Sequence, residues 1–191
     1  MTTLTLTGDP DADRLLSTNG FALLVGMLLD QQIAMELAFV GPHRLAERIE
    51  GDLDPAAIAS MDPDELEAIF RTKPALHRYP GSMAKRVHSL AAHIVEEYGG
   101  DATRVWSDAV DGRDLKRRMT SLPGFGDQKA RIFIALLGKQ CGVTPQGWQD
   151  AAGDYADDGH RSIADVVDAE SLAMVREFKQ QKKTQAKAAS R

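Results

Sequence analysis

The sequence contains a single cysteine, Cys141, in 191 residues. One thiol cannot form an internal disulfide, and it cannot supply the four cysteines of an iron–sulfur cluster or of an all-cysteine zinc site. The five histidines show no metal-binding spacing such as His-Glu-x-x-His. We therefore expect a protein without a disulfide, without an iron–sulfur cluster and without a zinc site of these types.

Long apolar runs and targeting segments are also lacking. No run approaches the roughly 18 apolar residues that a membrane-spanning helix needs, and residues 1–10 have neither the basic start nor the apolar core of a signal peptide. We therefore expect no membrane partner and a cytoplasmic location. At this length, residues 1–191 can form one compact domain or two small lobes that share a core.

Alternating strand patterns are nearly absent, whereas apolar residues recur at helical spacing. The clearest amphipathic helix is expected over residues 82–98, where Gly99-Gly100 ends it. Asp62-Pro63 predicts a capped helix start. The expected fold class is all-α, with eight to ten short helices and a basic tail that frays over residues 182–191. Further helices are expected over residues 21–30, 33–49 (with a break at Gly41-Pro42), 101–106, 113–121, 128–140, 144–152 and 168–181.

The net charge of −5 argues against a nucleic-acid partner, but the charge is unevenly placed. Residues 112–140 contain seven basic and two acidic side chains, and residues 171–191 contain six basic and one acidic. Phosphate binding depends on local basic surface rather than on total charge. The alternative is that both basic runs are simply solvated helix faces.

The segment Leu122-Pro123-Gly124-Phe125-Gly126 joins a polar, basic segment to an apolar helical run. Two glycines two positions apart predict a sharp turn with positive φ, and the amides that begin the next helix can then bind phosphate. Lys129 and Arg131 would add attraction that depends on salt. Asp127 lies where the phosphate would approach, unless its carboxylate caps the helix. We therefore expect Gly124, Phe125, Gly126, Lys129 and Arg131 to bind nucleic acid.

This hairpin resembles the helix-hairpin-helix of the HhH-GPD superfamily of base-excision DNA glycosylases. The segment Met27-Leu28-Leu29-Asp30-Gln31-Gln32-Ile33 resembles the early I-L-x-Q-Q helix of that family, and Gly81-Ser82-Met83-Ala84-Lys85-Arg86 resembles its G-x-x-x-K-A helix. Their order and spacing extend the resemblance over residues 20–150. It is closer to the 3-methyladenine glycosylase II branch than to endonuclease III, whose iron–sulfur cysteines are missing. The resemblance implies a two-lobed helical fold with the hairpin at residues 113–140.

The resemblance also implies a function. It predicts a monofunctional N-glycosylase that flips damaged, alkylated bases out of double-stranded DNA and hydrolyses the N-glycosidic bond. We expect such a protein to be a nucleoid-associated monomer. In the family, hairpin carbonyls bind a monovalent cation that bridges to the phosphate, and here these are the carbonyls of Leu122 and Phe125. Two alternatives remain open: a non-catalytic DNA- or lesion-binding protein, and a hairpin that contacts a protein partner.

The two positions that carry chemistry in the family depart from its pattern. A carboxylate stabilises the oxocarbenium-like sugar and activates water, but the position of the family's aspartate is occupied by Gln146. Asp150 is the nearest carboxylate and is our predicted catalytic residue; the alternative is a solvated side chain, and Asp154 and Asp30 are weaker substitutes. The Schiff-base lysine of bifunctional members corresponds to Gln128. We expect no lyase step, because Lys129 is turned by about 100° from that position.

Five further side chains are candidates for DNA contact. Trp148 could stack on a flipped base, although an indole that caps the core is an equal alternative. His77 and Tyr79 lie in a proline-bounded loop that could wedge into a duplex. Gln31 and Gln32 could read a base edge or contact the opposite strand, or they could bond to neighbouring backbone.

Overall fold

The computed structural model describes residues 3–49 and 51–189, which form eleven α-helices, two short 3-10 helices and no strand. The all-α prediction is confirmed. Within this part of the chain, no helix is both long and apolar enough to cross a membrane. The α-helices are α1 (Pro10–Thr18), α2 (Gly20–Leu29), α3 (Met35–Ile49), α4 (Pro55–Ser60), α5 (Pro63–Arg71), α6 (Pro80–Tyr98), α7 (Arg104–Ser107), α8 (Gly112–Ser121), α9 (Asp127–Gln140), α10 (Trp148–Ala152) and α11 (Ala169–Ala189); the 3-10 helices are η1 (Gly153–Tyr155) and η2 (Ile163–Asp165).

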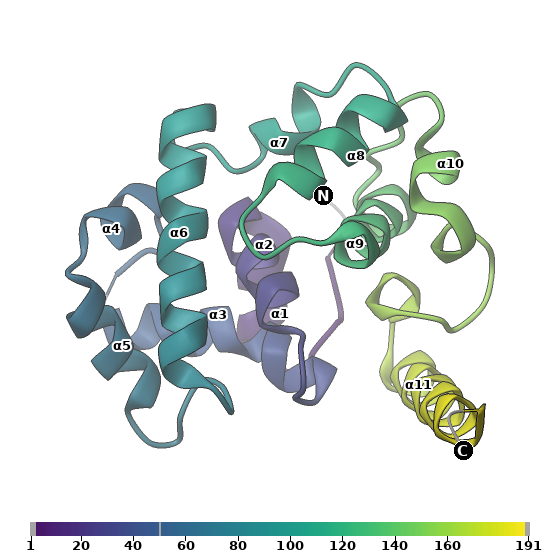
Figure 1. The fold of residues 1–191 in the computed structure, drawn as a ribbon, viewed down its shortest axis with the longest axis horizontal. Coiled ribbons are helices and arrows are strands. Elements are labelled where there is room, and N and C mark those ends of the chain that lie inside the picture. The colour runs from purple at the N-terminus through teal and green to yellow at the C-terminus, as the bar shows by residue number, and fades with distance from the viewer. Residues whose placement is uncertain (1–2, 50, 190–191) are drawn as a thin grey trace.

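Helix α2 is the centre of the fold. All but its first residue are buried, and it packs against α1, α3, α6 and α9. In Figure 1, α4, α5 and α6 lie on one side of α2, and α7 to α10 lie on the other. One continuous apolar core joins the two groups. Because α2 packs against α6 of one group and α9 of the other, the carboxyl end of α2 lies between the two groups.

Three helices begin at an Asp-Pro pair: Asp9-Pro10, Asp54-Pro55 and Asp62-Pro63. In each case the aspartate side chain accepts hydrogen bonds from amides of the first helical turn, and proline occupies the first helical position, where no amide is needed. Only the third pair was predicted. The helices α1 and α4 were missed, although the same signal marks both.

Helix α3 runs without a break through Pro42, so the predicted interruption at Gly41-Pro42 is wrong. Proline removes a hydrogen bond within a helix. Here the segment is buried, and α3 packs so closely on α2 that a Cβ on Gly41 would lie 2.7 Å from the Leu29 side chain. Tertiary packing therefore maintains the helix against the local preference.

Two predicted helix ends also differ. Residues 144–147 are not helical, and α10 begins only at Trp148. Helix α11 continues to Ala189, so residues 182–189 of the predicted frayed tail are helical, whereas Ser190 and Arg191 lie outside the described residues.

The chain after α9 returns along this helix toward its first turn. The amide of Gly112 donates to the Gln146 carbonyl at 2.8 Å, which places the start of α10 beside the start of α8. The Trp148 ring then covers Gly138, where a Cβ would lie 2.4 Å from the indole. As a result, η1 lies beside the beginning of α9, next to the hairpin.

Candidate functional site

Helices α8 and α9 are joined by a tight turn over residues 122–126. Leu122 and Phe125 are buried, and the Phe125 ring meets Phe133 edge-on. The Phe125 amide donates to the Leu122 carbonyl at 3.0 Å. Gly124 has a φ of +82°, as predicted, whereas Gly126 has a φ of −82°, so the prediction of positive φ is wrong for the second glycine.

The first turn of α9 presents backbone amides that have no partner. Gly126 is the N-cap residue, and no side chain caps the helix. The first helical bond runs from the Ala130 amide to the Gly126 carbonyl. Among the described residues, no acceptor is found for the amides of residues 126–129. A Cβ on Gly126 would meet nothing within 4 Å, so an anion can approach this positive helix end.

Asp127 does not cap α9. Its carboxylate pairs with the Lys116 ammonium at 2.8 Å and lies 4.0 Å from the Arg131 guanidinium. The hydrogen bond from Lys116 is the main reason why the pKa of Asp127 is lowered. Two cations therefore offset its charge, and the helix amides stay available.

Lys129 points into the protein rather than toward phosphate or solvent, which corrects our expectation. Its ammonium donates to the carbonyls of Met27 and Leu28, at 2.8 and 2.6 Å. These carbonyls belong to the last turn of α2, so Lys129 links the hairpin helix to the centre of the fold. Burial lowers the pKa of Lys129 to about 8, opposed by the nearby Asp30 carboxylate.

Arg131 is also engaged inside the protein. Its Nε donates to the Ala152 carbonyl at 3.3 Å, and its guanidinium lies over the Tyr155 ring. Gln128 donates to the Tyr155 hydroxyl at 3.0 Å. These contacts hold η1 against the first turn of α9, so Arg131 binds the protein instead of offering a free charge to DNA.

The loop after α2 carries the two glutamines. Gln31 donates from its amide nitrogen to the Leu28 carbonyl at 2.8 Å and accepts from Arg86 at 3.1 Å. The backbone alternative therefore holds for the Gln31 nitrogen. Gln32 is exposed and has a φ of +58°, which is uncommon for a residue with a side chain. Of the pair, Gln32 is the one presented outward.

His77 and Tyr79 take different positions. His77 is buried; its Nε2 donates to the Gln31 carbonyl at 2.9 Å and its Nδ1 accepts from the Tyr79 amide. Burial is the main reason why the pKa of His77 is lowered. His77 therefore holds the Gln31 loop in place and is not free to enter a duplex, which corrects that prediction. The Tyr79 ring is exposed, with the Arg78 guanidinium over it.

A sequence profile of the HhH-GPD superfamily of base excision DNA repair proteins matches residues 25–191. This chain belongs to the HhH-GPD superfamily. No curated protein and no solved structure gives a significant match. Membership in this superfamily implies DNA binding in base excision repair, and most of its members are DNA glycosylases. The amides at the start of α9 occupy the hairpin that the family uses.

The two hairpin carbonyls that we expect to bind a monovalent cation both have unused lone pairs. The Leu122 carbonyl accepts one hydrogen bond, from Phe125, and a second lone pair remains. The Phe125 carbonyl accepts none from the described residues. These two oxygens would hold the ion, which would add positive charge beside the α9 amides.

The two glutamines expected at the chemical positions of the family make ordinary contacts. Gln128 bonds to Tyr155, and Gln146 is exposed and bonds to Gly112 through its backbone. Asp150 is exposed as well, in a surface depression that Arg113 and Lys116 also line. This depression lies between α8 and α10.

Asp30 lies on the opposite side of α9. Its carboxylate is 12% exposed, lies 3.6 Å from the Lys179 ammonium and acts on the charge of Lys129. Lys129 faces α2, about 200° around the helix from Asp127, which faces α8. The structure thus brings Asp30, Gln31, His77 and Lys129 together and leaves Asp150 outside this group. The spacing of residues along the sequence could not reveal that Asp30 lies near Lys129. The available signal was that Asp30 directly precedes the Gln31-Gln32 pair.

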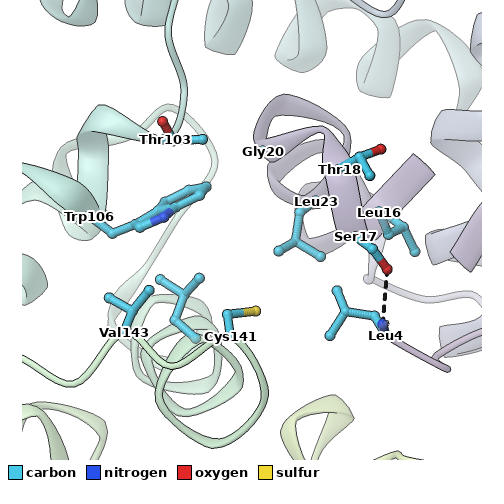
Figure 2. Close-up of a pocket in the computed structure, with 11 residues that line it drawn as sticks. Leu4, Leu16, Ser17, Thr18, Gly20, Leu23, Thr103, Trp106, Cys141 and Val143 are labelled. Carbon is cyan, nitrogen blue, oxygen red and sulfur yellow. Dashed lines mark hydrogen bonds between the residues drawn. The ribbon is translucent and has the colours of Figure 1, made fainter. Parts of the chain in front are cut away.

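Trp148 and an apolar pocket lie at the other end of α9. The half-buried indole of Trp148 covers Gly138, so the core-capping alternative describes it. The pocket has a volume of about 250 Å³. In Figure 2, Trp106 lies on one side of it, Leu23 on the other and the Cys141 thiol between them. Cys141 is an exposed residue, but desolvation by the surrounding protein raises the pKa of its thiol. Cys141 lies roughly 18 Å along α9 from Lys129, so this pocket does not adjoin the Gln31 loop.

Lys129 provides a test of the link between hairpin and α2. Its pKa is about 8 in the folded protein, below the ordinary 10.5, so between these values the unfolded chain binds more protons. The contribution of Lys129 to the free energy of unfolding should therefore rise as the pH increases from 8 to 10.5. We expect urea unfolding at pH 7.5 and 9.5 to show a rise in wild type that Lys129→Met lacks. If the free energy of unfolding changed with pH equally in wild type and in Lys129→Met, the buried position of the Lys129 ammonium would be contradicted.

Proposed function

We propose that this protein is a monofunctional DNA N-glycosylase that removes damaged, alkylated bases from double-stranded DNA, with Asp30 as the carboxylate. The observation that carries the proposal is the position of Asp30. It is partly enclosed, directly precedes the Gln31-Gln32 loop and faces Lys129 of the hairpin helix. Asp150, predicted from spacing, is the rival acid.

The hairpin would hold one phosphate beside the lesion through the unpartnered amides of α9. His77 bonds to the Gln31 carbonyl and to the Tyr79 amide, and so joins the loop that carries Gln32 to the segment that carries Tyr79. The exposed side chains of Gln32 and Tyr79 would therefore contact the DNA together. Such side chains can fill the space that a flipped nucleotide leaves in the duplex. Arg86, at the same loop, would supply charge toward the backbone.

The reaction breaks the bond between the sugar C1′ and the base nitrogen, and the bonding electron pair leaves with the base. The sugar then carries positive charge, which an ionised carboxylate stabilises. Water adds through its oxygen to C1′, and Asp30 would accept its proton. The base takes up a proton from solvent unless alkylation already gave it a positive charge.

No lyase step is part of this proposal. A lyase forms an imine between a lysine amine and C1′. Gln128 occupies the family's lysine position, and the Lys129 ammonium is bound to two α2 carbonyls. We therefore expect an intact abasic strand as the product.

The second candidate is a DNA-binding protein without catalysis. Gln146, in the position of the family's aspartate, is the observation that favours it. This candidate shares the hairpin and the salt dependence of DNA binding with the glycosylase. Only base release separates the two.

The test uses duplexes that carry 7-methylguanine or 3-methyladenine, with free base measured by chromatography. We expect release of at least one free base, and strand breakage only after alkali treatment. Binding to all duplexes without release supports the non-catalytic protein. Strand cleavage without alkali would contradict the absence of a lyase step.

A further inference from the structure

Helix α11 is long, basic and largely uncovered. Of its 21 residues, Ser171 and Val175 are buried, and residues 181–188 are all exposed. The helix carries an excess of positive charge, because it contains five basic and two acidic side chains. A helix that is polar around most of its surface gains little from core packing. In Figure 1, α11 lies at the lower right edge of the molecule.

The first half of α11 is held beside the candidate site. Arg176 pairs with Glu36 of α3, and Lys179 lies 3.6 Å from Asp30. The Lys179 ammonium also approaches the Met35 sulfur. Two ion pairs therefore direct α11 toward the segment that carries Asp30, Gln31 and Gln32.

Beyond this point the lysines share a face. Lys179, Lys183 and Lys187 recur every four residues, and together they line one surface depression with Gln180 and Thr184. Across the Gln31 loop from α11, Arg86 supplies a further exposed cation. The basic face therefore begins at the Asp30–Gln31–Gln32 segment and leads away from it.

We infer that α11 is a second DNA-binding element, which contacts the phosphates of the duplex that flanks the site. Lys179, Lys183 and Lys187 span about 12 Å of helix, and the same length of duplex axis carries roughly seven phosphate charges. Lys179 is paired with Asp30. Lys183 and Lys187 on this face pair with no carboxylate of the described residues, and neither does Lys182 beside it, whose ammonium lies over the Phe178 ring, so these three remain available to phosphate. This inference rests on the proposed DNA-binding function and gives the protein a second DNA-contact surface besides the hairpin.

The experiment compares wild type with the Lys182→Gln/Lys183→Gln/Lys187→Gln variant. Lys179 stays, because it pairs with Asp30. Glutamine and lysine have similar helix propensities, so α11 should persist, which circular dichroism checks. The Lys→Arg variant at the same three positions is the matched control, because it keeps the charge. The readout is affinity for a 24-base-pair duplex as a function of salt.

We expect the slope of log affinity against log salt to fall by about 2 to 3 in the glutamine variant, with roughly 10- to 500-fold weaker binding at 0.1 M salt. The arginine variant should behave as wild type.

An unchanged slope in the glutamine variant would overturn the inference while leaving hairpin binding intact. Equal loss in the arginine variant would overturn it as well, because charge would then not be the cause. Stronger binding of the wild-type protein to phosphatidylglycerol vesicles than to the duplex at equal salt, lost in the glutamine variant, would assign the helix to a membrane surface instead. Failure of wild type to bind any duplex would refute the proposed function itself.

Discussion

Replacing Gly126 with alanine is expected to weaken binding to duplex DNA by roughly 10- to 100-fold and to leave the fold intact. The backbone accepts alanine, because φ is −82° and the added Cβ meets nothing within 4 Å. That empty space is where a phosphate would approach the α9 amides. Charge-assisted hydrogen bonds contribute about 1.5–3 kcal/mol each, which corresponds to the expected loss. The cost to stability at an N-cap position is up to about 1 kcal/mol.

Fluorescence anisotropy with a labelled duplex measures this effect, and thermal unfolding checks the fold. Gly51→Ala is the matched control, since its Cβ makes one ordinary contact at 3.8 Å, and Gly51 lies between α3 and α4. Gly124→Ala is a poorer test because its φ of +82° strains any alanine. Unchanged binding by a folded Gly126→Ala protein would remove the hairpin from the DNA interface.

The second large effect is expected from Asp30→Asn, which should lower the rate of base release by about 10²- to 10⁴-fold. Asparagine keeps the size of the side chain and removes the charge that stabilises the sugar and accepts the proton of water. The affinity of Asp30→Asn for DNA should not fall, because the substitution removes a negative charge that would repel the DNA phosphates. The assay is single-turnover release of free base, with anisotropy on the same preparation.

Two controls separate catalysis from structure. Lys179→Gln breaks the 3.6 Å ion pair but keeps the carboxylate, so base release should largely persist at saturating protein. Asp150→Asn should have little effect, because that side chain is exposed between α8 and α10. The opposite result, with Asp150→Asn inactive and Asp30→Asn active, would make Asp150 the acid, as the spacing predicts.

Local signals along the chain predicted most helices, because their causes are local. Asp62-Pro63 predicts a capped start, Gly99 ends α6 in the left-handed conformation, and the hairpin turn follows from Gly124. The break expected at Pro42 is absent because its cause is not local. Burial of α3 against α2 outweighs the proline preference there, and no local pattern reports that burial.

The sequence by itself determined the all-α class, the hairpin and its family resemblance, since these depend on residue types a few positions apart. Only the tertiary structure decided where the functional side chains point. Lys129 reaches carbonyls about one hundred positions away in the chain, His77 is enclosed by the Gln31 loop, and Asp30 lies beside Lys179 of the last helix. Such contacts depend on which helices pack together, and a side chain that looks like a free charge in sequence can become an internal link once they do.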